Sequence, residues 1–374
     1  MIYLDNAATT FPKPPSVVEE FRRASLLSAG NPGRGTHSLA LAASEEIYSL
    51  REALAAFFSL DKPENVVLTF NATYALNIAI SALRQPGHIL ISDLEHNSVR
   101  RPVAALGGSY SVFRALEREN VLRDIRRKCR RDTYMIVCTQ ASNTANVTLP
   151  LVEISQFCRE RGIKLVIDAS QGAGFYPLDF KSIAADAICV PAHKALYGIQ
   201  GAGAVLFADK YRGRELRPLI SGGSGVGSAL LEMPTRLPER LEAGTLSVPL
   251  AAAWKEGIRV VSETGIDVIC EHCSALRSYT ENALLQLPDV RVYMPGAKSG
   301  SLVLFNIDGI SAGEVGRELD RRGICVRSGL HCAPSAHASL GTGKDGAVRA
   351  SFGAFNTLSD AEALCNAVEE IVRR

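Results

Sequence analysis

Short apolar runs alternate with segments that favour helix through the middle of the chain. Runs rich in β-branched or large apolar residues, each bounded by turn residues, occur at 66–70, 88–92, 134–139, 165–168, 187–190 and 204–207. Runs of this length and composition are typical of buried strands. Helices are predicted between them, for example at about 74–83 and at 152–161, where Gly162 is suited to end the helix. The alternation predicts an α/β fold with a mostly parallel sheet and helices on both faces.

The pattern changes near Pro249. Two long helices are predicted there, at about 249–263 and 266–286, followed by a strand at 301–307 that seeds a second sheet. A last helix is predicted at 359–373, with Ser359 as its N-cap and Glu362 three residues later. We therefore expect two domains: a large one over 15–248 and a smaller C-terminal α/β domain over 249–374.

Polar residues follow five of the predicted strands: Thr73, His96, Asn143, Asp168 and Lys194. Ligands bind at the carboxyl ends of the strands in sheets of this kind, so one site can collect all five. Thr73 also suits a plain helix cap, and a strand-end histidine is often structural.

A lysine directly after a buried strand either reaches solvent or does chemistry, because its ammonium cannot stay unpaired in the core. An ordinary loop lysine is the simpler interpretation of Lys194 taken alone. Asp168 changes this, because it ends a buried strand about one β-α-β unit earlier. Pyridoxal phosphate needs such a pair: the lysine holds it covalently, and the aspartate keeps its ring nitrogen protonated.

The bulk composition indicates a soluble globular enzyme or binding protein. Of 374 residues, 47% are hydrophobic and 21% charged, and the net charge of +2 gives no indication of nucleic acid or a membrane surface as a partner. We expect a cytoplasmic protein, because the start has no signal-peptide pattern and the nine cysteines have no framework spacing. The basic run within 117–131 suits a solvated helix face, with a docking patch for an acidic partner as the alternative. Cys270 to Cys273 is a weak metal motif, and no metal is expected.

Several motifs, in the right order, resemble a known family. Tyr3-Leu4-Asp5-Asn6-Ala7-Ala8-Thr9-Thr10, the Asp168 and Lys194 stretches, and Arg349-Ala350-Ser351-Phe352 are similar to fold-type I, class V aminotransferase-like proteins of the cysteine desulfurase and selenocysteine lyase group. Arg327-Ser328-Gly329-Leu330-His331-Cys332-Ala333 resembles the short cysteine loop of the group II, SufS-like enzymes.

The resemblance implies roles for individual residues. It makes Lys194, Cys332 and His96 catalytic, and it places segment 1–14 near the active site. Arg349, Arg327 and Asn143 bind the substrate, and Thr245 reaches the phosphate of a neighbouring subunit in a homodimer with shared sites. The implied cofactor-binding residues are Ala72, Thr73, His96, Asn143, Asp168, Gln171, His193, Lys194 and Thr245.

The implied activity is that of a cysteine desulfurase, which converts L-cysteine to L-alanine and leaves a persulfide on Cys332 for an acceptor protein. A selenocysteine lyase acting on L-selenocysteine, a class V aminotransferase with no need of Cys332, and a non-enzymatic sulfur-relay scaffold stay open as alternatives. The chain departs from the family pattern at three positions: Ala72 and Pro191 stand where hydroxyl residues are usual, and Asn97 where a second histidine is common.

Overall fold

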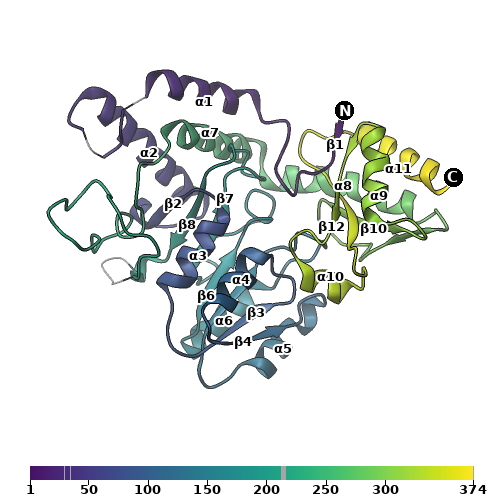
Figure 1. Ribbon diagram of the computed structural model, residues 1–374, viewed down its shortest axis with the longest axis horizontal. Coiled ribbons are helices and arrows are strands. Elements are labelled where there is room, and N and C mark those ends of the chain that lie inside the picture. Colours follow the sequence, from purple (N-terminus) through teal and green to yellow (C-terminus); the bar gives the residue numbers. More distant parts are fainter. Residues whose placement is uncertain (29, 34, 212–215, 374) are drawn as a thin grey trace.

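A seven-stranded sheet forms the centre of the larger part of the molecule (Figure 1). The computed structural model describes residues 1–28, 30–33, 35–211 and 216–373. In sheet order the strands are β2 (Val66–Thr69), β8 (Gly203–Phe207), β7 (Ala187–Pro191), β6 (Lys164–Asp168), β5 (Thr133–Thr139), β3 (His88–Ser92) and β4 (Ser109–Phe113). The pairs of β8 with β2 and with β7 are antiparallel and the other four neighbouring pairs are parallel, so the predicted, mostly parallel α/β sheet is confirmed.

Helices cover both faces of this sheet because its strands are apolar on both sides. In β3, Ile89 and Ile91 pack on one face and Leu90 on the other. The first face is covered by α3 (Ala72–Ala82) and α4 (Asn97–Ala105). The opposite face carries α2 (Ser38–Phe57), α5 (Val121–Lys128), α6 (Leu151–Arg161) and α7 (Val248–Thr264). Helix α1 (Pro15–Leu27) packs against α7.

A second sheet lies in the C-terminal part, with the antiparallel order β12 (Arg327–Gly329), β13 (Ala347–Ser351), β10 (Leu302–Ile307) and β9 (Val290–Val292). Its core includes residues of α8 (Ile266–Leu284), α9 (Ala312–Arg321) and α11 (Leu358–Val372). Helix α10 (Pro334–Leu340) follows β12. By packing, α7 belongs to the first sheet and α8 to the second; the domain boundary at residue 249 stays a prediction.

The N-terminal segment joins the two parts. Strand β1 (Ile2–Tyr3) pairs in parallel with β11 (Ile324–Cys325). The chain then turns toward the large sheet, where the Thr10 amide donates to the His193 carbonyl over 3.1 Å. We call residues 2–13 the N-terminal strap.

Two helix starts differ from the sequence-based prediction. Helix α11 begins at Leu358, because Thr357 and Asp360 form a reciprocal capping box; Ser359 lies inside the helix, so its assignment as N-cap is wrong. Helix α3 begins at Ala72, and its cap is the Asn71 side chain, which accepts from the Tyr74 amide. Thr73 is therefore not the cap and keeps its hydroxyl for other contacts.

The basic run within 117–131 includes helix α5. In α5 the side chains of Arg123, Arg126 and Arg127 are exposed, as a solvated helix face requires. No helix within the described residues is long and apolar enough to cross a membrane.

Candidate active site

One cavity lies at the carboxyl ends of β2, β3, β5, β6 and β7. It collects ten of the twelve residues singled out from the sequence: Ala72, Thr73, His96, Asn143, Asp168, Gln171, His193, Lys194, Arg327 and Arg349. Each of these residues in the large sheet stands at or just after the carboxyl end of its strand. The carboxyl ends of parallel strands share one edge of the sheet, so the topology brings the residues together. Cys332 lies beside the cavity, next to His331 of its lining, and Thr245 lies elsewhere.

Lys194 is the reactive amine of this cavity. Burial lowers the pKa of Lys194 to about 8; Asp168 opposes this shift, whereas Arg349 and Arg327 add to it. Much of the lysine is thus neutral near pH 8, and only a neutral amine is a nucleophile. The aspartate ends β6 almost fully buried, and its Oδ1 accepts from the Ser170 amide over 2.9 Å.

Two histidines flank this pair. His96 caps α4, and its pKa is lowered chiefly by burial, so its ring is neutral near neutral pH. His193 has its pKa lowered to about 4, again chiefly by burial. The Nδ1 atom of His193 is buried and has no hydrogen-bond partner among the described residues. A buried polar atom without a partner indicates a site shaped for a missing group.

Two helix N-termini meet at one end of the cavity. Thr73 Oγ1 lies 2.8 Å from Ser98 Oγ, and Ser98 Oγ lies 2.8 Å from His96 Nδ1. The first amides of α3 together with these hydroxyls form a place for a phosphate, whereas the first two amides of α4 already donate to the Cys332 carbonyl and to His96 Nδ1. Ser98 was not singled out from the sequence, although it stands in the first turn of a helix that follows a strand end.

The strap anchors the backbone that carries Lys194. The His193 carbonyl accepts from the Thr10 amide, from the hydroxyls of Thr9 and Thr10 over 3.1 and 3.2 Å, and from Lys13 Nζ over 2.8 Å. The Thr10 hydroxyl also lies 3.0 Å from the Lys194 carbonyl. The strap therefore fixes where the Lys194 side chain starts.

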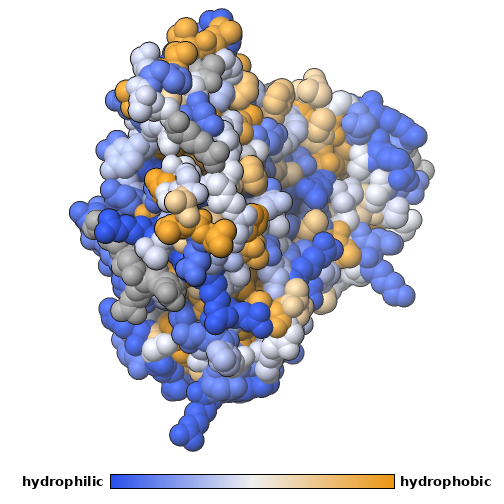
Figure 2. Space-filling model, turned by 60° about the vertical axis from the view of Figure 1, so that its left-hand side comes forward, coloured by the Kyte–Doolittle hydropathy of each residue, from blue (hydrophilic) through white to orange (hydrophobic). Residues whose placement is uncertain are grey.

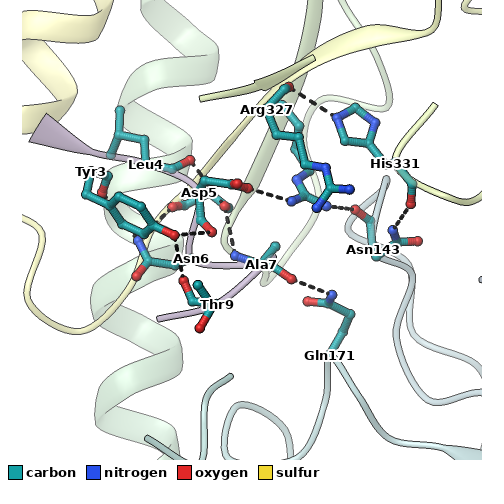
Figure 3. Close-up of polar contacts among 12 residues, drawn as sticks. Tyr3, Leu4, Asp5, Asn6, Ala7, Thr9, Asn143, Gln171, Arg327 and His331 are labelled. Carbon is teal, nitrogen blue, oxygen red and sulfur yellow. Dashed lines mark hydrogen bonds and ion pairs between the residues drawn. The ribbon is translucent and has the colours of Figure 1, made fainter. Parts of the chain in front are cut away.

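The arginine end of the cavity is held by contacts between distant parts of the chain (Figure 3). Arg349 donates to Asp5 Oδ1 over 2.8 Å and to the Asn143 carbonyl over 2.9 Å, while its buried Nε has no partner among the described residues. Gln171 donates to the Ala7 carbonyl over 2.9 Å. The contact between Asp5 and Arg349 joins residues far apart in the chain, so no local sequence pattern predicts it.

Cys332 sits on a tight turn with an exposed side chain. His331 and Cys332 both have left-handed backbone, with φ of 49° and 54°. The Cys332 carbonyl accepts from the Asn97 amide over 2.7 Å, and the His331 carbonyl from Asn143 Nδ2 over 2.8 Å. The turn is thus held against the N-terminus of α4 and the edge of the cavity.

Thr245 lines a different cavity, together with the largely apolar Phe70, Tyr74, Ile220 and Trp254. The first turn of α3 lies between the two cavities, since it gives Thr73 to one and Tyr74 to the other. Within one chain, Thr245 does not join the Lys194 site.

The Cys270–Cys273 stretch has a structural explanation. His272 Nε2 donates to the Asn356 carbonyl over 2.8 Å, tying α8 to the start of α11. Within the part of the chain that the structure describes, no three His, Cys, Asp or Glu side chains are placed to hold a metal ion.

Comparison with known proteins agrees with this arrangement of fold and site. The family model described as aminotransferase class-V matches residues 2–364. The chain belongs to the class-V aminotransferase family. A probable cysteine desulfurase of Aeropyrum pernix is 33% identical over all of this chain and 94% of its own length. One from Synechocystis is 29% identical over 100% and 91%.

Solved structures of cysteine desulfurases have the same fold as this chain. An apo cysteine desulfurase from Thermococcus onnurineus superposes with a TM-score of 0.90 at 28% identity, over 100% of this chain and 94% of that one. A cysteine desulfurase from Escherichia coli gives 0.87 at 26% identity, over 99% and 94%. The family is known for pyridoxal phosphate, and the residues present fit that group: Lys194 and Asp168 in one cavity, a His193 Nδ1 with no partner among the described residues, and the α3 N-terminus with the Thr73 and Ser98 hydroxyls.

Proposed function

We propose that this chain is a cysteine desulfurase that uses pyridoxal phosphate. The observation that carries the proposal is the position of an exposed thiol, Cys332, on a turn fastened to the rim of a cavity that holds Lys194, Asp168 and two arginines. An aminotransferase of this fold needs the lysine and the aspartate but has no use for the thiol. The similarity to named cysteine desulfurases over the full chain supports the same assignment.

The residues divide the work of binding. Lys194 would hold pyridoxal phosphate covalently, Asp168 would face its ring nitrogen, and His96 would lie against the ring. The α3 N-terminus with the Thr73 and Ser98 hydroxyls would hold the phosphate. When bound, the cofactor supplies an electron sink for negative charge at the substrate Cα. Arg349 and Arg327 bind the α-carboxylate, for which a guanidinium is the natural partner.

The chemistry at the thiol follows from charge and position. Freed Lys194 takes the proton from the substrate Cα at Nζ and returns a proton after sulfur leaves. Cys332, as thiolate, attacks the sulfur of L-cysteine while the carbon–sulfur bond of the substrate breaks. The thiol becomes a persulfide, and the substrate carbon skeleton, reduced at Cβ, leaves as L-alanine. The persulfide sulfur then passes to a thiol of an acceptor protein.

The decisive experiment measures L-alanine from L-cysteine without any added oxo acid, together with the mass of the Cys332 peptide. We expect alanine formation and a gain of one sulfur on Cys332. Cys332→Ala should keep the cofactor but lose at least about 100-fold in rate, because the nucleophile is gone. Cys325→Ala, at a half-buried cysteine of β11, is the matched control and should stay active. Full activity of Cys332→Ala, or dependence on an oxo acid, contradicts the proposal.

We further propose a homodimer in which Thr245 serves the phosphate of the partner subunit. Thr245 is separated from the Lys194 cavity of its own chain by the first turn of α3. Figure 2 shows apolar side chains gathered on the face that carries residues 216–233, the end of α1 and the start of α2. Exposed large apolar residues of these segments are Leu26, Leu27, Leu39, Leu41, Leu219, Ile220, Val226, Leu230 and Leu231. A second copy of the chain would cover them.

The state of the cysteines favours the cytoplasm as the location of the protein. All nine cysteines carry free thiols, which is typical of a reducing compartment. A persulfide on an exposed cysteine also requires such surroundings to be passed on intact.

A further inference from the structure

A chain of buried hydrogen bonds runs behind Cys332. Thr342 Oγ1 lies 2.7 Å from His337 Nδ1, and His337 Nε2 lies 2.9 Å from His331 Nδ1. His331 Nε2 lies 3.2 Å from the carbonyl oxygen of Arg327. His331 and His337 are 4% and 1% exposed, and their rings lie nearly parallel, with planes 19° apart and centroids 5.1 Å apart. We call Thr342, His337 and His331 the histidine relay.

The carbonyl at one end fixes the direction of every bond in the relay. The Arg327 oxygen can only accept, so His331 Nε2 carries a hydrogen, and in the neutral ring Nδ1 must then accept. His337 Nε2 therefore donates to His331, which leaves His337 Nδ1 to accept from the Thr342 hydroxyl. Each ring nitrogen has one defined role, and all four are satisfied.

Both rings are neutral, as this arrangement requires. Burial lowers the pKa of His331 to about 3, with Arg349 adding to the shift, and lowers that of His337 to about 4. A proton on His331 Nδ1 would face the donor of His337, so the bond directions given above apply while both rings are uncharged. Near neutral pH, well above these two pKa values, both rings are uncharged and the arrangement is intact.

The relay connects three separate backbone segments. Arg327 lies in β12, His331 lies in the turn that carries Cys332, and His337 lies in α10 with Thr342 just after it. The turn between them has two consecutive left-handed residues without glycine, a conformation that persists only where surrounding contacts impose it. The relay is such a contact from inside, while Asn97 and Asn143 hold the turn from the cavity side.

We propose that the histidine relay is the positioning device for Cys332, holding its turn in the left-handed conformation that keeps the thiol at the rim of the cavity. His331 and His337 are positioning residues in this role, and neither needs to touch substrate. The proposal deepens the proposed desulfurase function, yet its structural part can be tested without substrate.

The test measures backbone hydrogen exchange in the protein loaded with pyridoxal phosphate but free of substrate. The Asn97 amide bonds to the Cys332 carbonyl and the Ala333 amide to the Leu330 carbonyl, so peptides with these amides report on the turn. In His337→Leu we expect exchange of both amides to quicken by about tenfold or more, because a buried hydrogen bond is lost. In His337→Gln the side-chain amide can still donate to His331, so exchange should stay within about threefold of native.

The chain offers a matched control in His88. His88 is fully buried, and its ring nitrogens lie 2.8 Å from Thr133 Oγ1 and 2.9 Å from Ser111 Oγ. It is the first residue of β3, so it lies at the end of that strand opposite the cavity and the Cys332 turn. His88→Leu removes the same kind of group and should leave exchange at Asn97 and Ala333 unchanged. If His337→Leu does not fold, Thr342→Val removes only the last donor and should quicken the same amides to a smaller degree.

Three results would overturn the proposal: native exchange in the folded relay variants, equal loosening in His88→Leu, or no rescue by glutamine. Kinetics give an independent readout if the desulfurase activity is established. His337→Leu should then lower kcat by about tenfold with KM within about twofold, since substrate binding does not use the thiol. Loss of activity in every variant with unchanged exchange would count against the relay, whereas loosened exchange in a protein inactive on cysteine would fault only the proposed function.

Discussion

Arg349 Nη2 lies 2.8 Å from Asp5 Oδ1, so the guanidinium proposed to bind substrate is already paired with a carboxylate from the other end of the chain. The arginine is almost fully buried, while about a fifth of the aspartate side chain is exposed. The pair orients Arg349 and offsets part of its charge, and the guanidinium Nε, which has no partner within the described part of the chain, is available to a ligand.

Asp5 should therefore tune the affinity for the substrate carboxylate. Asp5→Asn keeps an oxygen for Nη2 but removes the negative charge, so KM for L-cysteine should fall about threefold as the positive potential of the cavity rises. Substrates with a second negative charge, such as cysteine sulfinate, should gain more. Asp5→Ala is the contrasting variant: it lets the guanidinium turn, and KM should rise. Equal KM values for all three proteins would show that the ion pair does not act on substrate.

The lowered pKa of Lys194 predicts how cofactor loading depends on pH. The apo protein should take up pyridoxal phosphate covalently about tenfold faster per pH unit between pH 6 and 8, and at a constant rate above, because only the neutral amine reacts. Stability of the apo protein should rise between about pH 8 and 10.5, because there the folded state binds fewer protons than the unfolded state. Stopped-flow absorbance measures the rate of cofactor uptake, and urea unfolding at a series of pH values measures the stability.

Lys194→Met is the control for these measurements. It should bind the cofactor without a covalent bond and lose the rise in stability over that pH range. In the native protein, borohydride reduction followed by peptide mapping should place the pyridoxyl group on Lys194. A pyridoxyl group on another lysine would contradict the assignment.

Ser98 should be part of the phosphate site. Its hydroxyl bridges Thr73 and His96 where Ala72 and Pro191 supply no hydroxyl. Ser98→Ala should weaken retention of pyridoxal phosphate about tenfold in equilibrium dialysis, as expected for one charge-assisted hydrogen bond. Ser335→Ala, in α10 outside the lining of the cavity, provides a hydroxyl deletion that should have no effect. Unchanged retention in Ser98→Ala would remove Ser98 from the site.

Thr245 should act across the proposed dimer. Thr245→Ala should weaken cofactor retention by about tenfold, and so should show in dialysis even before activity is measured. Mixed with Lys194→Ala, it should regain activity on subunit exchange, because each mixed dimer then has one site with both lesions and one with neither. A monomer in solution, or proven exchange without recovery, would mean that Thr245 does not serve a partner.

The sequence was sufficient for six of the seven strands of the large sheet, because strands buried on both faces appear as continuous apolar runs. The edge strand β4 was missed, because most of its side chains are exposed and it lacks such a run. It was also sufficient to gather the cavity residues, since strand ends of a parallel sheet share one edge. Capping was harder: Ser359 and Thr357 are both suitable caps two residues apart, and the path of the chain into the helix decided for Thr357. The ion pair of Asp5 with Arg349 and the histidine relay depend on tertiary packing, which spacing along the chain does not encode.

The N-terminal strap has a consequence for the order of assembly during translation. Strand β1 pairs with residues 324–325, Asp5 pairs with Arg349, and Asn6 donates to Asn356 Oδ1 over 3.0 Å. Residues 2–6 therefore leave the ribosome long before the residues that hold them, and must wait for these before they reach their final places. A nascent chain that has emerged through β8 already has every strand of the large sheet, but its arginine end stays open until synthesis has passed residue 356.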